Sequence, residues 1–136
     1  MNQSPNRLVA TIFGAVYLLV GVLGLFVAGP HFAGEEGGLL LGIFQVNHLH
    51  NIAHLAIGAA LLVAGLRSTP AARSTNITVG AVYLVLGIIG FFLVGTALNI
   101  LALNTADHIL HLLSAIVLLG TGLGLERDAR TRRAAV

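Results

Sequence analysis

The sequence predicts an all-α fold, an integral membrane four-helix bundle built from two tandem two-helix repeats. Three observations predict it. Of the 136 residues, 57% are hydrophobic and only 9% are charged, whereas soluble domains carry roughly a quarter charged residues. Four apolar runs are each about 20 residues long, the length that crosses a bilayer. A motif in the first run returns in the third, which indicates a duplication.

The apolar runs set the predicted spans. They cover residues 8–28, 46–66, 77–98 and 104–125. Together with the links between them they use nearly the whole chain, so we expect a single transmembrane domain over residues 1–136 and no separate soluble domain. The chain has no cysteine, which excludes disulfides, thiolate metal sites and cysteine nucleophiles.

The duplication is read from two pairs of segments. GAVYLLVGVLG at 14–24 returns 66 positions later as GAVYLVLGIIG, with seven of eleven residues identical, and NHLHNIAHL at 47–55 aligns 57 positions later with NTADHILHL. The repeats are therefore predicted at about 8–66 and 77–125, with a longer internal loop in the first. Because each repeat has two spans, both enter the membrane in the same direction, related by a pseudo-twofold axis along the membrane normal.

Positive charge predicts the orientation. All basic residues lie in the amino-terminal tail, in the link between the repeats or in the carboxy-terminal tail: Arg7, Arg67, Arg73, Arg127, Arg130, Arg132 and Arg133. Cytoplasmic segments carry such an excess, so both termini and the link are expected in the cytoplasm. Glu35 and Glu36 in the longer loop are then expected to face outward. The expected partners are the lipid bilayer and other membrane proteins or a second copy of the chain, with no nucleic acid.

Polar residues gather near the start of the second and fourth spans. On a helix with 100° per residue, Asn47, His50 and His54 lie within about 60° of one another, and the fourth span repeats this face. Its members are Asn104, Asp107 and His111, with Asn51 and His108 at the flanks of the two faces. Small residues continue both faces and favour close helix approach, so these faces are expected to point into the protein.

The spacing predicts a metal site. His50 and His54 would face Asp107 and His111, and two such pairs on facing helices close a four-coordinate site. Ligation dominated by imidazole suits zinc, copper or iron. Around it, the asparagines, His108, Tyr17 and Tyr83 are interpreted as caps or as support for the ligands. Each tyrosine hydroxyl is expected either to reach the cluster or to bond a backbone carbonyl.

Two alternatives remain open for the same residues. In the first, Asn47 and Asn104 cap their helices, Asp107 completes a capping box, and the histidines hydrogen-bond across the interface as a structural clasp. In the second, His54 and His111 are axial ligands of a haem. The small bundle and the polar residues beside these histidines disfavour haem.

The segments GLLLGIFQVNHLHNIAHL and LNTADHILHLL resemble a small four-span bacterial membrane family that is classified only as a domain of unknown function. Its pattern is Asn-x-x-His-Asn-x-x-His in the first half and Asn-x-x-Asp-Asn-x-x-His in the second. The chain matches it except at His108, where asparagine is usual. The resemblance covers nearly the whole chain and implies a four-span fold in the bacterial cytoplasmic membrane, without an established activity.

The sequence favours binding or structure over catalysis. It holds no arrangement of nucleophile, base and orienting group, no phosphate-binding glycine loop and no nucleotide fingerprint. We therefore do not expect an enzyme. Transport is disfavoured because no proline or charge lines a path through the inner half. His31 and His48 have no counterparts in the second repeat and are interpreted as residues of the outer surface.

Overall fold

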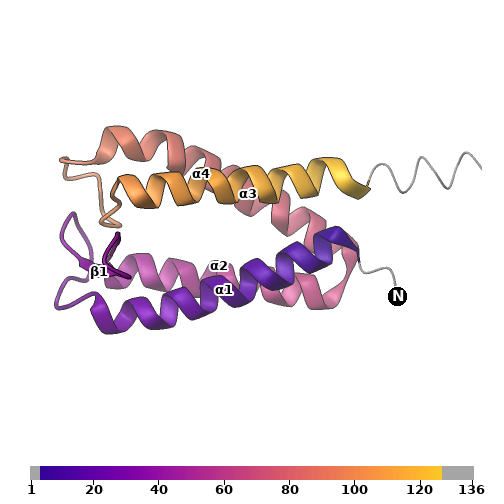
Figure 1. The fold of residues 1–136 in the computed structure, drawn as a ribbon, viewed down its shortest axis with the longest axis horizontal. Coiled ribbons are helices and arrows are strands. Elements are labelled where there is room, and N and C mark those ends of the chain that lie inside the picture. The colour runs from indigo at the N-terminus through magenta and orange to yellow at the C-terminus, as the bar shows by residue number, and fades with distance from the viewer. Residues whose placement is uncertain (1–3, 127–136) are drawn as a thin grey trace, which may run out of the picture.

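Four long helices form two hairpins in the computed structural model, which describes residues 4–126. Helix α1 (Pro5–Val27) packs along α2 (His48–Arg67), and α3 (Thr69–Leu93) packs along α4 (Thr105–Gly120) (Figure 1). A π-helical turn, η1 (Thr121–Leu125), extends α4. Each of the four helices, counting η1 with α4, is long and apolar enough to cross a membrane. The chain is a multi-pass membrane protein with a four-helix bundle, as predicted.

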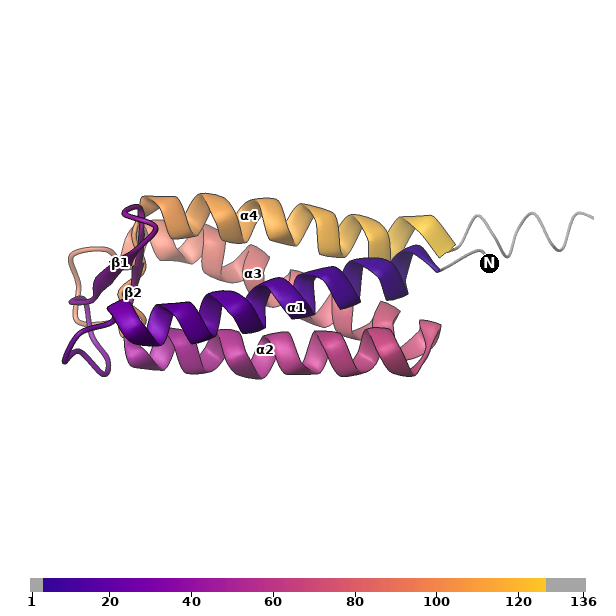
Figure 2. The same cartoon turned by 60° about the horizontal axis from the view of Figure 1, so that its bottom comes forward.

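The two ends of the bundle differ. The start of α1, the link between α2 and α3, and the end of η1 lie at one end, whereas the loops that join α1 to α2 and α3 to α4 lie at the other (Figure 1, Figure 2). We call these the link end and the loop end. The predicted basic tail lies outside the described residues; its members are Arg127, Arg130, Arg132 and Arg133.

The link between the hairpins is shorter than predicted. Helix α3 begins at Thr69 rather than at residue 77, because Ser68 ends α2 and at once caps α3 by accepting a hydrogen bond from Ala71 N at 3.3 Å. The polar residues that follow Ser68 form the first turns of α3 instead of a loop. The helix also ends early, at Leu93, and Gly95 (φ 78°) turns the chain away.

The longer loop of the first half contains a small β-hairpin, which the sequence analysis did not predict. Strand β1 (Gly38–Leu40) pairs antiparallel with β2 (Phe44–Val46). Three residues, 41–43, connect the strands; Leu41 (φ 54°) and Gly42 (φ 74°) lie in succession in the left-handed region, and Ile43 N donates to Leu40 O at 3.2 Å to close the turn. Strand β2 ends directly before the cap of α2 and so helps to position that helix.

Glycine allows the close approach of the helices within each hairpin. A Cβ atom at Gly14 would lie 2.4 Å from the backbone nitrogen of Leu62, and one at Gly80 would lie 3.0 Å from that of Leu119. Such contact between backbones is the packing that small residues permit in membranes. The predicted glycine faces are therefore packed faces.

These contacts are matched between the two hairpins. Gly80 and Leu119 stand 66 and 57 positions after Gly14 and Leu62, the same offsets that align the two halves of the sequence. Further contacts obey the same offsets: Gly21 with Leu55 and Gly87 with Leu112, and Gly24 with Asn51 and Gly90 with His108. The tandem repeat is an interpretation of the sequence. Matched contacts of this kind are what a tandem repeat predicts.

Adding a methyl group at the α1–α2 contact should destabilise the protein. We expect Gly14→Ala to lower the free energy of unfolding by about 1–3 kcal/mol, the usual cost of overpacking, because the new Cβ would collide with the backbone of α2. Gly120→Ala is the matched control, since no atom lies within 4 Å of its added Cβ. Unfolding of both variants in detergent measures the difference, and equal stability would contradict the packing described here.

Candidate metal centre

Two asparagines begin the helices that carry the polar cluster. Asn47 Oδ1 accepts from His50 N at 2.9 Å, and Asn104 Oδ1 accepts from Asp107 N at 3.1 Å. Both caps have extended backbone with nearly identical angles (φ −116° and −115°, ψ 179°). The predicted capping role of the two asparagines is confirmed.

The capping side chains also tie the loops together across the bundle. Asn47 Nδ2 donates to Ile100 O at 2.9 Å, in the loop of the second half, and Asn104 Nδ2 donates to Ile43 O at 2.8 Å, in the first half. Asn47 Nδ2 also lies 3.0 Å from Gly34 O. These crossed bonds hold the starts of α2 and α4 in a fixed relation, which positions the side chains one turn below.

Asp107 belongs to the helix cap rather than to the group of candidate ligands. Its Oδ2 accepts from Asn104 N at 2.9 Å, which completes the predicted capping box. A carboxylate at this position also interacts favourably with the positive end of the helix dipole. The four-ligand set predicted from spacing is thus reduced to three histidines, because the Asp107 side chain turns back toward the start of α4.

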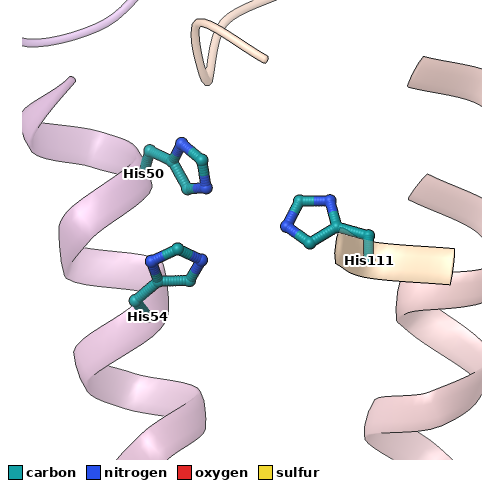
Figure 3. Close-up of side chains that lie close together, drawn as sticks. All are labelled: His50, His54 and His111. Carbon is teal, nitrogen blue, oxygen red and sulfur yellow. The ribbon is translucent and has the colours of Figure 1, made fainter. Parts of the chain in front are cut away.

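Three histidines do come together. His50 and His54 on α2 face His111 on α4 (Figure 3), and one ring nitrogen from each lies within 4.8 Å of the others. The ring centroids of His50 and His54 are 4.4 Å apart, and those of His54 and His111 are 6.3 Å apart. With exposed fractions of 2%, 4% and 2%, all three side chains are buried. We call these residues the three-histidine cluster.

Five of the six ring nitrogens of the cluster lack hydrogen-bond partners, as do both ring nitrogens of His108 outside it. Both nitrogens of His50, both of His54 and Nδ1 of His111 are buried and make no hydrogen bond of normal geometry with the described residues. Backbone groups of Gln45 and Leu101 lie near the His50 ring. Most buried polar side-chain atoms in proteins have at least one partner, and an exception calls for an explanation such as a bound ion or water. The predicted clasp, in which these histidines hydrogen-bond across the interface between the repeats, is not formed by these five nitrogens.

Two tyrosines cover the cluster on its lower side, toward the middle of the bundle. The Tyr83 ring stacks on His111 at 4.9 Å with an interplanar angle of 7°, and the Tyr17 ring lies 5.3 Å from His54. The Tyr17 hydroxyl donates to Ser114 Oγ at 2.8 Å, neither to the cluster nor to a backbone carbonyl as the sequence analysis expected. Sequence reasoning missed Ser114, although it stands one turn after His111 on the same helical face.

The remaining predicted residues lie outside the cluster. Asn51 packs against Gly24, and His108 packs against Gly90 with its ring 4.7 Å from that of Phe91. At the loop end, His48 Nε2 lies 2.9 Å from Gly29 O, and His31 pairs with Glu36 at 3.3 Å. None of these side chains belongs to the three-histidine cluster.

Comparison with known proteins identifies the family. The model of a family described as Domain of unknown function (DUF4383) matches residues 7–124, which is most of the chain. The chain belongs to this family. The resemblance expected from the paired asparagine and histidine motifs of this DUF4383 protein is therefore confirmed. No curated protein and no solved structure matches the chain.

The capping box predicts a contrast between two substitutions of Asp107. Asp107→Asn keeps an oxygen that can accept from Asn104 N, so we expect only a small change in the free energy of unfolding. Asp107→Ala removes the acceptor from a partly buried amide and should cost about 0.5–2 kcal/mol, as for the loss of other helix caps. Thermal unfolding in detergent measures both variants, and equal losses would show that the cap does not depend on the acceptor oxygen.

Proposed function

We propose that this DUF4383 protein binds one transition metal ion through His50, His54 and His111. The observation that carries the proposal is the convergence of three buried imidazoles: one ring nitrogen from each lies within 4.8 Å of the others, and five of the six ring nitrogens have no hydrogen-bond partner among the described residues. Metal ligation would satisfy one nitrogen of each ring, and imidazole is a common ligand of zinc, copper and iron. The ligands come from both hairpins, so a bound ion would also join α2 to α4.

The distances support this proposal. Two nitrogens bound to one zinc ion at 2.0–2.1 Å in a tetrahedral site lie about 3.4 Å apart. The candidate ligand atoms lie within 4.8 Å of one another, so side-chain rotations that bring them closer by at most about 1.4 Å would complete the site. Helix spacing supports it as well, since His50 and His54 are four residues apart and stand one above the other.

The haem alternative fits this geometry less well. A porphyrin held between His54 and His111 would need a wide flat space between the two rings. The His50 ring lies 4.4 Å from that of His54 and 6.0 Å from that of His111, so it stands beside the same gap. Tyr17 and Tyr83 close the other side. These contacts favour a bare ion over a macrocycle.

The orientation of the protein is part of the proposal. Arg7 and Arg73 lie at the link end, where Arg7 Nε donates to Gly65 O and Arg73 Nε donates to Gly122 O. By the positive-inside tendency, this end faces the cytoplasm. The three-histidine cluster lies toward the loop end, with His54 and His111 both about 9 Å below the starts of their helices at 1.5 Å per residue. The metal would therefore be held in the outer half of the bilayer.

Removal of a ligand should strongly weaken metal binding without a loss of fold. We expect His54→Gln to weaken zinc, copper or ferrous iron binding by about 10–100-fold or more, because even changes beside a ligand have effects of that size. His108→Gln is the matched control, a buried histidine of α4 that faces Gly90 instead of the cluster. Elemental analysis of the purified variants after metal addition checks this. Equal retention by wild type and His54→Gln would overturn the proposed site.

Cysteine labelling tests the orientation. Cysteine placed at Glu36 should react with a membrane-impermeant thiol reagent in intact cells, and cysteine placed at Thr69 should react only after the membrane is permeabilised. The native chain has no cysteine, so each variant carries a single reactive thiol. The reverse pattern would place the link end outside the cell and the cluster in the cytoplasmic half.

A further inference from the structure

The donor set and its surroundings point to one ion among the candidates, and we propose that the three-histidine cluster is a site for Cu(I). This inference rests on the proposed function and deepens it by naming the metal and its oxidation state. Three properties of the site carry it: the charge of its ligands, their number, and the buried position of the cluster between hydrophobic helices.

The first property is charge. Histidine binds metals as neutral imidazole, so the three ligands bring no negative charge to the ion. Asp107 is the one acidic residue within the described helices α1–α4 and η1, and its carboxylate completes the cap of α4. The ion would keep its full charge in a buried site. The Born cost of burying an ion rises with the square of its charge, so a monovalent ion is strongly favoured over a divalent one.

The second property is the number of ligands. Protein zinc sites are almost always four-coordinate, with a fourth protein ligand in structural sites and a water or substrate in catalytic ones. Here three histidines form the group, and no fourth histidine, cysteine or carboxylate belongs to it among residues 4–126. Cu(I) forms stable complexes with two or three ligands as well as with four, so three imidazoles are enough to complete its coordination.

The third property is the surroundings. The rings of Tyr17 and Tyr83 cover His54 and His111 from below, and the Tyr17 hydroxyl is engaged with Ser114. A divalent ion in this site would have to bring its own anion, such as hydroxide, into a region of aromatic and apolar side chains. Cu(I) needs no such anion. The cluster in Figure 3 therefore suits a reduced, monovalent copper ion better than zinc or ferrous iron.

Metal competition on the purified full-length protein tests this inference. The protein in detergent, stripped with chelator, is loaded without oxygen either with Cu(I) kept reduced by ascorbate or with zinc sulfate. Each sample is then titrated with a chelator of known affinity for that ion. We expect wild type to retain one Cu(I) per chain and to bind zinc at least about tenfold more weakly, the scale of ligand effects at metal sites. The loaded copper should give no Cu(II) signal in electron paramagnetic resonance.

One substitution adds a negative charge to the ligand set and so tests the charge argument. His50→Asp replaces a neutral ligand with a carboxylate while it keeps His54 and His111. This variant should lose Cu(I) affinity and gain zinc affinity relative to wild type, because the carboxylate partly neutralises a divalent ion. His108→Gln should keep the wild-type preference, and circular dichroism of each variant establishes that the helices are intact.

The outcomes separate this inference from the proposed function. If wild type binds zinc more tightly than Cu(I), and His54→Gln loses the zinc, the cluster is a metal site and the copper inference is wrong. If folded wild type retains neither ion, or His54→Gln retains copper as well as wild type does, both proposals fail. Both proposals are supported if wild type binds Cu(I) more tightly than zinc, if this binding depends on His54, and if the His50→Asp substitution shifts the preference toward zinc.

Discussion

Lipid offers no hydrogen-bond partner, and this constraint decides where the polar side chains of this DUF4383 protein lie. Within the described helices, the fully buried side chains include asparagines and histidines, whereas large aliphatic and aromatic side chains such as Phe26 and Phe92 are exposed. The exterior is apolar, whereas the interior holds the polar groups together with a hydrophobic core that includes Leu61 and Leu118. Because the asparagines and histidines face inward, the polar first turns of α2 and α4 lie near each other at the loop end. This arrangement brings the three-histidine cluster together.

Glycine residues allow the helix backbones of each hairpin to approach closely. Gly14 brings the backbones of α1 and α2 together, and Gly80 does the same for α3 and α4. At the link end the contact is polar: Asn76 Nδ2 donates to Asn6 Oδ1 at 3.0 Å, and Asn6 Nδ2 donates to Thr121 O at 3.2 Å. Amide hydrogen bonds thus join the hairpins at the link end, as those of Asn47 and Asn104 join them at the loop end. One turn below the loop-end bonds, histidines stand between α2 and α4, and five of their six ring nitrogens have no partner among the described residues. These unpaired, converging nitrogens are the structural basis of the metal proposal.

Much of the fold and part of the site could be predicted from the sequence. Helix periodicity and hydropathy are local properties, so the four spans, the inward face of His50, His54 and His111, and the two asparagine caps follow from spacing alone. Side-chain rotamers, in contrast, depend on the hydrogen-bonding groups around each side chain in the folded structure. The spacing of Asp107 and His111 places both on one face, but the competition between capping and ligation is decided by the backbone amide of Asn104. Hydropathy also missed the first turns of α3, because a helix capped by Ser68 continues through polar residues. The turn at Leu41 was missed because an L residue with positive φ gives no compositional signal.

The central claim is that three imidazoles, two from α2 and one from α4, meet at a single metal ion. X-ray absorption at the K-edge of the metal bound to the purified protein tests it most directly, because multiple scattering from imidazole rings counts the histidine ligands. The account predicts three imidazole nitrogens at about 2.0 Å and the edge energy of Cu(I). A first shell dominated by oxygen, with one imidazole or none, would contradict the account.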